Sequence, residues 1–334
     1  MLKNKTTKVL IAVTVVSLVG LLVLHQSLRF SQAGLLKRET FGEVSNDLDY
    51  ARPNDGSVSS EKRPRLPKAL IIGFSKCGTT ALRTFLTLHP DIVSPIEEVR
   101  YFNFNYSKGL EWYRQQMPPS TEQQITIEKT PSYIMSTEAL SRIYMYDSLI
   151  KLIIIVRDPI VRLQSQYAHT FRNVPRSSQK PSFKNWCKGA SNDNRIVHFV
   201  GYTKYIRLVY NRFPKDQVLV LSEEDLEKNP LSVMRDVECF LSLRPAFSKD
   251  MFYYNKGKGF YCFNRESKFF PTVLKMVKVN NRTGCLGEDK GRDHPDIDDD
   301  FFEELKKMIR PHNEQLFRLI GKRIRWENFA EDDD

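Results

Sequence analysis

The chain has 334 residues, of which 41% are hydrophobic, and it carries a formal net charge of +11. The apolar fraction suffices for one sizeable core, so the composition excludes a chain too polar to fold and favours one globular domain with an appendage. The excess of lysine and arginine favours an anionic partner, and composition leaves nucleic acid, an anionic membrane surface and an acidic polysaccharide open.

The N-terminal sequence predicts a membrane anchor. Residues 1–8 contain three lysines, and the uncharged run Val9–Leu24 follows them without a small-residue cleavage motif. We therefore expect a cytoplasmic tail over residues 1–8 and an uncleaved signal-anchor helix over residues 9–25, with the rest of the chain luminal. A cleaved signal peptide is the alternative.

The sequence changes character after the anchor. Residues 26–66 are polar and contain scattered Pro, Gly and Ser, which predicts a flexible luminal stem. Strand-like runs then alternate with helical periodicity over residues 67–328, and an acidic tail follows at 329–334. This alternation predicts a doubly wound α/β fold, with a mostly parallel sheet flanked by helices.

The run Lys68–Pro90 predicts a strand, a tight loop and a helix. Ala69–Ile72 is apolar, the glycine-framed loop Gly73–Gly78 contains Lys76, and Thr79–Thr80 open the helical pattern. Such a P-loop-like turn presents backbone N–H groups and a positive helix dipole, which favour phosphate. No lysine directly follows the second glycine, which disfavours a kinase or NTPase. A plain strand–turn–helix without a ligand is the alternative.

Ser94–Phe102 predicts a short extended segment or loop beside the sheet. It places Glu97, Glu98 and Arg100 among apolar and aromatic residues. A carboxylate in an apolar setting suits a general base. An ordinary solvated pair of glutamates is the alternative.

Two further strands bring polar residues to one edge of the predicted sheet. Gln124–Lys129 is expected to be a strand that Thr130–Ser132 ends, and Ile150–Val156 is expected to be the central strand. Arg157 and Ser165 then lie at the carboxyl end of the central strand, where open α/β sheets bind ligands.

The rest of the chain continues the alternation with one interruption. The expected elements are an irregular stretch over Phe183–Arg195, a helix over Tyr202–Phe213, a strand over Gln217–Ser222, a helical run over Leu226–Leu241 with a start at Asn229-Pro230, and a final helix over Phe301–Leu319. Residues 253–295 break the pattern, because they are rich in Lys, Gly, Asn and aromatic residues.

Five cysteines leave at least one thiol unpaired. Cys262 and Cys285 flank a basic segment and form the best candidate pair, whose disulfide would close a long loop and hold Lys290–Arg292 in place. A solvated basic loop is the alternative. Cys77 and Cys239 are expected to be buried thiols.

Two further sequence signals concern glycosylation and metals. Asn105 and Asn281 begin glycosylation sequons, which a luminal chain can use. The histidines and cysteines lack metal-ligand spacing, so no metal site is predicted.

Four groups of segments resemble the Golgi heparan sulfate sulfotransferases, and most closely the glucosaminyl 3-O-sulfotransferases. They are KCGTTAL with TLHPDI, EEVRYFN with SKGLEWY, EKTPSY with RDPIVRLQSQY, and KGFYC…CLGEDKGRDHPDID. The resemblance implies a single-pass type II Golgi membrane protein. Its luminal domain would transfer a sulfuryl group from 3′-phosphoadenosine 5′-phosphosulfate (PAPS) to the 3-hydroxyl of glucosamine in heparan sulfate or heparin. It implies no metal and no nucleic-acid partner.

The resemblance also implies roles for particular residues. Glu98 matches the catalytic base of the family, and Lys76 would stabilise the leaving group. The residues that would hold the nucleotide are Lys76, Cys77, Gly78, Thr79, Thr80, Arg157, Ser165, Tyr261, Lys290, Gly291, Arg292, Asp293 and His294. The residues that would contact the acceptor are Glu97, Arg100, Lys129, Thr130, Pro131 and Ser132.

The match departs from the family pattern at two of these positions. Thr80 stands where the 3-O enzymes usually carry arginine, and Arg100 stands where they usually carry histidine. The GTTAL and YFN forms look more like the N-sulfotransferases. An N-sulfotransferase and a catalytically inactive heparin-binding homologue therefore stay open as alternatives.

Overall fold

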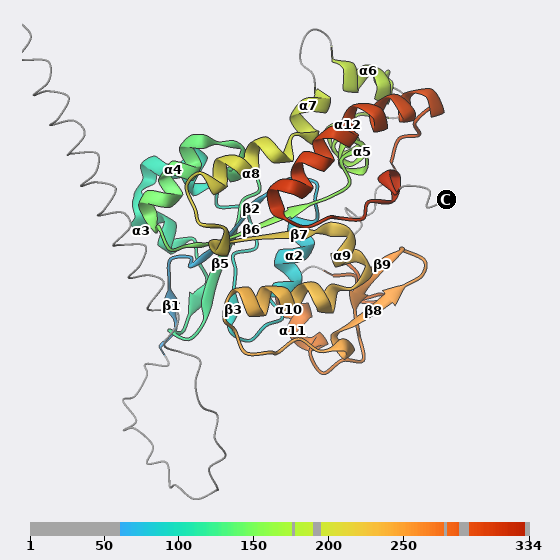
Figure 1. Ribbon diagram of the computed structural model, residues 1–334. Coiled ribbons are helices and arrows are strands. Elements are labelled where there is room, and N and C mark those ends of the chain that lie inside the picture. Colours follow the sequence, from blue (N-terminus) through green and yellow to red (C-terminus); the bar gives the residue numbers. More distant parts are fainter. Residues whose placement is uncertain (1–60, 176–177, 190–194, 277–278, 287–293, 331–334) are drawn as a thin grey trace, which may run out of the picture. The chain divides into compact units, whose positions relative to one another are not determined.

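The computed structural model describes residues 61–330, except 176–177, 190–194, 277–278 and 287–293 (Figure 1). The predicted cytoplasmic tail and signal anchor lie outside the described residues, as does most of the predicted stem. Among the residues that the structure describes, no helix is both long enough and apolar enough to cross a membrane.

A five-stranded parallel sheet forms the centre of the domain. Its strands, in spatial order, are β3 (Ile92–Val93), β5 (Ile125–Lys129), β2 (Ala69–Gly73), β6 (Lys151–Val156) and β7 (Val218–Ser222). Every pairing in this sheet is parallel, which confirms the predicted α/β class. The expected central strand, β6, is an interior strand, but the middle position belongs to β2.

Helices cover both faces of the sheet. They are α2 (Thr79–Leu86), α3 (Gly109–Gln115), α4 (Thr137–Tyr146), α5 (Pro159–Thr170), α6 (Phe183–Lys188), α7 (Arg195–Val200), α8 (Tyr202–Tyr210), α9 (Glu223–Lys228), α10 (Pro230–Phe240), α11 (Phe270–Met276) and α12 (Asp299–Ile320). Figure 1 shows α4 and α8 on one face and α2 and α10 on the other. This arrangement follows from right-handed crossovers between parallel strands, because the chain leaves β2 in one direction and β5 in the other.

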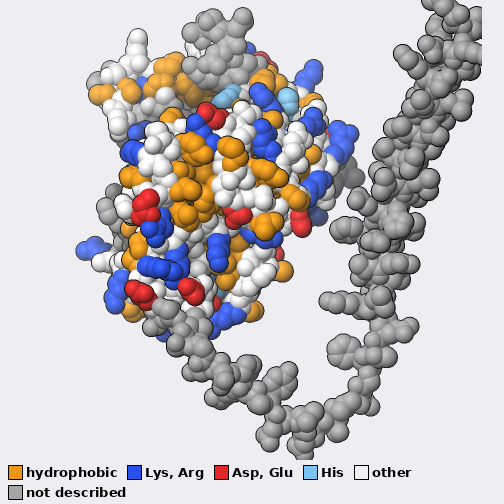
Figure 2. Space-filling model, turned by 90° about the vertical axis from the view of Figure 1, so that its left-hand side faces the viewer, with side chains coloured by type: hydrophobic (Ala, Val, Ile, Leu, Met, Phe, Trp, Pro, Cys, Tyr) orange, Lys and Arg blue, Asp and Glu red, His pale blue; other side chains and the backbone are white. Residues whose placement is uncertain are grey.

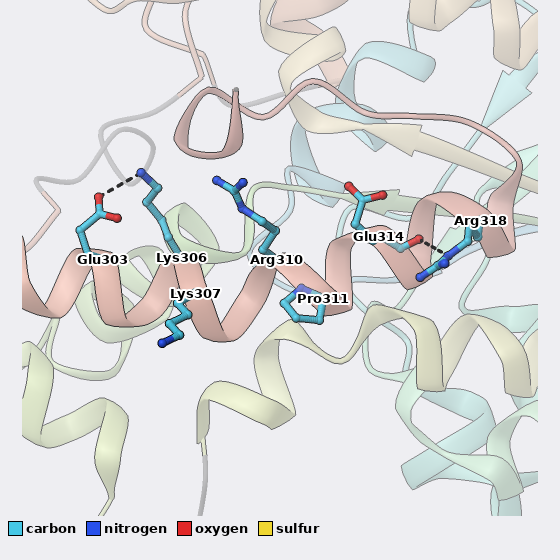
Figure 3. A pocket seen from close by; sticks show the side chains of 7 residues that line it. All are labelled: Glu303, Lys306, Lys307, Arg310, Pro311, Glu314 and Arg318. Atoms are coloured by element: carbon cyan, nitrogen blue, oxygen red, sulfur yellow. Dashed lines mark hydrogen bonds and ion pairs between the residues drawn. The ribbon is translucent and has the colours of Figure 1, made fainter. Parts of the chain in front are cut away.

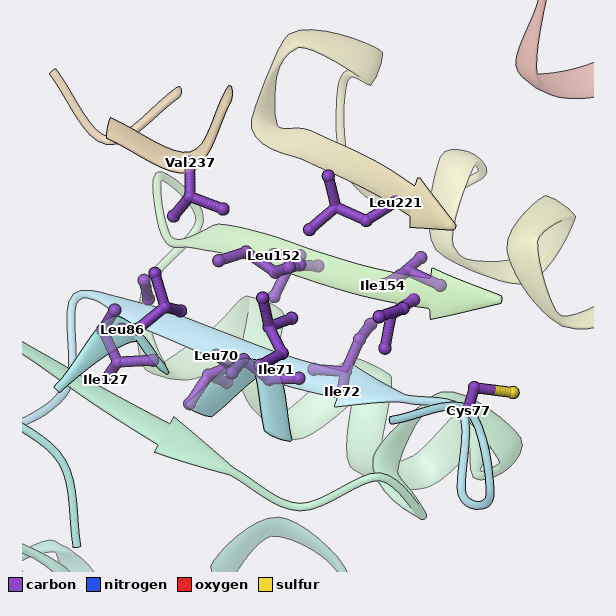
Figure 4. Close-up of a cluster of buried hydrophobic side chains, with 14 of the residues drawn as sticks. Leu70, Ile71, Ile72, Cys77, Leu86, Ile127, Leu152, Ile154, Leu221 and Val237 are labelled. Atoms are coloured by element: carbon purple, nitrogen blue, oxygen red, sulfur yellow. The ribbon is translucent and has the colours of Figure 1, made fainter. Parts of the chain in front are cut away.

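The core lies between these helices and the sheet. Figure 4 shows Leu70 and Ile72 of β2, Leu152 and Ile154 of β6, and Val237 of α10 in one cluster of buried side chains. These side chains are 0% exposed. The strands are apolar on both faces, as buried parallel strands are, so the core holds the strand ends rigidly.

Small sheets complete the fold outside the main sheet. β1 (Arg63–Pro64) pairs antiparallel with β4 (Pro119–Ser120). β8 (Phe252–Asn255) pairs antiparallel with β9 (Phe260–Phe263), within the segment where the sequence breaks the helix–strand alternation.

The helix start expected at Asn229-Pro230 is confirmed, since Asn229 ends α9 and its side chain caps α10. Two other expectations from the sequence are wrong in detail. Residues 183–195 are not irregular throughout, because the Ser182 hydroxyl caps α6 and Phe183 and Trp186 are buried. Cys239 is exposed, because it lies about 200° around α10 from the buried Val237.

Candidate active site

The candidate residues lie at one edge of the sheet, at the carboxyl ends of four neighbouring strands. Lys129 ends β5, the loop with Lys76 follows β2, Arg157 follows β6, and Glu223 follows β7. Backbone hydrogen bonds tie these ends together: Thr130 N–H donates to Ile71 O over 3.1 Å, and Phe74 N–H donates to Ile155 O over 3.0 Å. The backbone that carries the site is therefore held rigidly by the sheet and its core.

The loop between β2 and α2 has the backbone of an anion cradle. Gly78 has φ +77°, and a Cβ at this position would lie 2.7 Å from the Glu223 side chain, so only glycine fits. Lys76 also adopts a left-handed conformation, with φ +68°. A non-glycine residue held at positive φ is strained, and such residues concentrate at functional sites. The loop leads directly into the first turn of α2, whose N–H groups have no helical acceptor.

Two neighbouring side chains, Arg162 and Tyr202, contact the cradle loop and hold it in place. The buried Arg162 guanidinium donates from Nε to Ser75 O over 3.1 Å. Cys77 is fully buried, and its Sγ lies 3.5 Å from the Tyr202 hydroxyl. Burial raises the pKa of the Cys77 thiol to about 11, so the thiol stays protonated. Only the backbone of Cys77 is therefore available to a phosphate.

Arg157 forms an ion pair with two acidic residues of α9. Its Nε lies 2.9 Å from the Glu223 carboxylate, and its Nη2 lies 3.6 Å from that of Glu227. Burial raises the pKa of Glu223, and the charge of Arg157 opposes that rise. Ser165 lies on α5 and is half-buried.

Glu98 lies in the segment before the π-helix η1 (Tyr101–Asn105), at the same edge of the sheet. Glu98 accepts a hydrogen bond from Lys129 Nζ over 2.8 Å, and its other oxygen accepts from Arg100 over 3.2 Å. The Glu98 side chain is 27% exposed. The expected apolar setting of Glu98 is therefore wrong, because two cations face its carboxylate.

The turn after β5 supports the same segment. The Thr130 hydroxyl accepts from the Arg100 N–H over 3.2 Å, and the Ser132 hydroxyl accepts from Asn103 Nδ2 over 2.9 Å. Pro131 is buried and Glu97 is exposed. The structure thus brings Glu98, Lys129 and Arg100 together, whereas Thr130 and Ser132 bind the protein's own backbone and side chains.

Three residues near this edge were not predicted from the sequence. Glu128 is buried beneath the Glu98 segment, and Glu223 is buried beside the cradle. Arg83 of α2 is 4% exposed, and its Nε has no hydrogen-bond partner among the described residues. Burial lowers the pKa of the Arg83 guanidinium, and the negative charge of Glu97 opposes that change. The sequence could have indicated Glu223, because it directly follows a buried strand. It could also have indicated Glu128, because it is an acid within an otherwise strand-forming run.

The second nucleotide segment is described only in part. Cys262 and Cys285, the predicted pair, form a disulfide that spans 23 positions of the chain. Tyr261 is half-buried on β9, and His294 is exposed. The predicted nucleotide contacts Lys290, Gly291, Arg292 and Asp293 lie outside the described residues.

The two sequon asparagines differ in environment. Asn281 is exposed in a turn. Asn105 is half-buried, and its Nδ2 donates to Val99 O over 2.8 Å. A glycan on Asn105 would therefore attach to an atom that already holds the Glu98 segment, whereas Asn281 is sterically open.

Other surfaces lack the predicted site residues. Figure 2 shows hydrophobic side chains gathered on the face where α3 and α4 lie, and these helices expose Leu110, Tyr144 and Met145. A groove on α12 (Figure 3) is lined by Glu303, Lys306, Lys307, Arg310, Pro311, Glu314 and Arg318. Within the described ranges, no group of three or more His, Cys, Asp or Glu side chains could hold a metal ion.

A family model described as the sulfotransferase domain matches residues 66–320, so the chain belongs to the sulfotransferase family. A crystal structure of a sulfotransferase from Alicyclobacillus acidocaldarius superposes with a TM-score of 0.56 at 18% identity, covering 78% of this chain and 98% of that one. This likeness concerns the fold alone.

Sequence relatives narrow the family. The chain is 36% identical over 282 residues to heparan sulfate glucosamine 3-O-sulfotransferase 3B1 of Homo sapiens, covering 84% of this chain and 70% of the relative. It is 37% identical over 272 residues to the Homo sapiens 3-O-sulfotransferase 5, covering 78% and 74%. Within the sulfotransferases, the chain therefore belongs with the heparan sulfate glucosamine 3-O-sulfotransferases.

Proposed function

We propose that the protein transfers a sulfuryl group from PAPS to the 3-hydroxyl of glucosamine residues in heparan sulfate. The observation that carries this proposal is the pairing of Glu98 with Lys129 at the same sheet edge as the Lys76 cradle. The names of the relatives support the acceptor, and the net charge of +11 suits a polyanionic chain.

The described residues fit the donor. The left-handed Lys76, the glycine-only position at Gly78 and the opening turn of α2 form a concave set of N–H groups beside a cation. Bound PAPS supplies an activated sulfuryl group on a phosphate leaving group. Lys76 to Thr80 would hold the 5′ end, and Arg157 and Ser165 would hold the 3′-phosphate. Tyr261 and residues 290–294 would form the second contact segment.

The proposed reaction rests on the match of Glu98 and Lys76 to the catalytic residues of the family. Glu98 takes the proton of the acceptor hydroxyl while that oxygen forms its bond to sulfur. The bond between sulfur and the bridging oxygen of the 5′-phosphate breaks, and Lys76 with the α2 N–H groups stabilises the charge left on that oxygen. Lys129 and Arg100 orient the Glu98 carboxylate. These side chains supply the positive charge, so the proposal requires no metal.

The proposed location is the Golgi membrane, with residues 9–25 as a type II anchor and the catalytic domain in the lumen. The disulfide between Cys262 and Cys285 supports an oxidising compartment. The proposed partners are heparan sulfate or heparin and the Golgi membrane, and nucleic acid is not among them.

Product mapping tests the proposal. The purified protein is incubated with sulfur-labelled PAPS and heparan oligosaccharides of defined structure, and the products are digested to disaccharides. We expect the label on the 3-oxygen of glucosamine. Label on the glucosamine nitrogen would identify an N-sulfotransferase, and binding of heparin without transfer would identify an inactive homologue.

A further inference from the structure

A fully buried carboxyl group lies beneath the segment that carries Glu98. Glu128 of β5 is 0% exposed. The Thr130 hydroxyl donates to one of its oxygens over 2.5 Å, and the Tyr113 hydroxyl donates to the other over 3.3 Å. The Tyr133 hydroxyl and the Val99 N–H also lie near this carboxyl group, and both favour its ionised form. Two hydroxyl groups thus donate to a fully buried carboxyl group.

Hydroxyl groups beside Glu128 hold the backbone of the Glu98 segment. The Thr130 hydroxyl accepts from the Arg100 N–H over 3.2 Å and donates to Glu128, so it relays one amide to the buried carboxyl group. The Tyr133 hydroxyl accepts from the Phe102 N–H over 3.4 Å and lies beside Glu128. Two amides that closely follow Glu98 are therefore held by hydroxyl groups next to one buried carboxyl group.

The segment needs this support because its backbone is strained. Arg100 has φ 54° and ψ 32°, a left-handed conformation that is strained for a non-glycine residue. Such a conformation persists only where the surroundings hold it. Arg100 is also the second residue after Glu98, and its guanidinium donates to the Glu98 carboxylate over 3.2 Å, so the turn holds a side chain that contacts Glu98.

We propose that Glu128 is a positioning residue that fixes residues 99–102 and so aims Glu98 at the acceptor hydroxyl. The inference rests on the proposed role of Glu98 as general base. Glu128 contacts neither reactant, and it acts only through the amides that it holds. Loss of this support misplaces the base, and a displacement of about 1 Å costs on the order of 10²-fold in rate.

The ionisation of Glu128 gives the network a pH dependence. The titratable and charged groups around it are Tyr113 of α3, Tyr133 after β5, and Lys129 on its own strand. Burial raises its pKa to about 7. A protonated Glu128 accepts fewer hydrogen bonds than the ionised form, so the network loosens as pH falls through about 7.

Three variants test the inference. Glu128→Gln removes one acceptor oxygen, and Tyr133→Phe removes the hydroxyl that accepts from the Phe102 amide. Tyr113→Phe is the matched control, because it also deletes one buried hydroxyl that donates to Glu128. Among the described hydrogen bonds, this hydroxyl accepts from no amide of residues 99–102. We expect kcat to fall about 10²-fold for Glu128→Gln and about 10-fold for Tyr133→Phe, with an unchanged KM for PAPS. For Tyr113→Phe we expect kcat within about 2-fold of the wild type.

Hydrogen–deuterium exchange supplies a readout that needs no activity. The amides of Val99, Arg100 and Phe102 should exchange faster in Glu128→Gln and stay protected in Tyr113→Phe. The kcat of the wild type should fall as pH drops through about 7, and Glu128→Gln should lose this limb. Unchanged exchange in Glu128→Gln would overturn the structural role, and faster exchange with normal kcat would overturn the positioning role. A wild type without any transfer would overturn the proposed function and with it the catalytic part, while the exchange still reports whether Glu128 holds the segment.

Discussion

The two halves of the proposed active site are held in different ways. The proposed donor half is the cradle after β2, which the backbone bond from Phe74 N–H to Ile155 O ties to the neighbouring strand and the buried Arg162 side chain holds at Ser75 O. The proposed acceptor half is the segment of residues 97–105, and mainly polar side chains fix it. Thr130 holds the Arg100 amide, and Asn105 holds the Val99 carbonyl.

The two halves should therefore differ in how much sequence change they tolerate. Backbone bonds between strand ends survive most substitutions, so we expect the donor half to tolerate sequence change outside its glycine, its lysine and the Arg162 side chain that holds Ser75. The acceptor half depends on individual hydroxyl, amide and carboxyl groups, so single substitutions can redirect Glu98. We therefore expect acceptor preference to vary through residues such as Arg100 and Asn103, and donor use to stay constant.

The largest expected effect is on the acceptor half. Glu98→Gln keeps the size of the side chain but removes the base, so kcat should fall about 10²- to 10⁴-fold while the KM for PAPS stays near that of the wild type. Initial rates with labelled donor provide the measurement. Glu122→Gln, an exposed glutamate far along the chain, is the control for the charge change. An equal loss of donor affinity and turnover would count against the separation of the two halves.

Removing the cation of the donor half should cost nearly as much. Lys76→Ala removes the ammonium group that stabilises the leaving oxygen, so kcat should fall about 10²- to 10³-fold in the same assay. Lys68→Ala is the matched control, because Lys68 is exposed just before the opposite end of β2. Near-normal turnover of Lys76→Ala would show that another cation stabilises the leaving group.

A backbone change in the cradle should act on nucleotide affinity. Gly78→Ala introduces a Cβ that meets Glu223 at 2.7 Å, and it also strains a residue with φ +77°. We expect affinity for adenosine 3′,5′-bisphosphate to weaken about 10-fold in calorimetry. Gly321→Ala is the control, because Gly321 has a similar left-handed backbone, with φ +70° and ψ 18°, and nothing within 4 Å, so this variant adds the strain without the collision. Equal nucleotide affinity in the two variants would contradict the cradle geometry.

The smallest effect on turnover should come from the disulfide. Replacing both Cys262 and Cys285 by Ser frees a loop with a sequence separation of 23, which should lower the free energy of unfolding by about 3 kcal/mol. Denaturant unfolding measures this change, with Cys239→Ser as the control for loss of an exposed thiol. An unfolding free energy equal to that of the control would show that the bridge does not support the fold.

The donor half was predictable from the sequence, and the acceptor half only in outline. The strand, loop and helix around Lys76 follow from local patterns, since apolar runs and glycines report backbone conformation directly. The ion pair of Glu98 with Lys129 joins residues 31 positions apart. The neighbouring sequence VRYF indicated an apolar setting, because periodicity carries no information about which distant cation faces a carboxylate.

The buried acids show the same limit. Glu128 lies in a strand-forming run and Glu223 follows a strand, but their burial depends on Tyr133 and Arg157 arriving from other elements. The exposed Cys239 marks a shorter-range error, in which an apolar-looking run hid the outward face of α10.

The division of labour between the two halves is the central claim, and nucleotide binding tests it most directly. Calorimetric titration with adenosine 3′,5′-bisphosphate should give the same affinity for the wild type and Glu98→Gln, and a weaker one for Lys76→Ala. No binding heat with the wild type, or a loss of affinity in Glu98→Gln as large as in Lys76→Ala, would contradict the account.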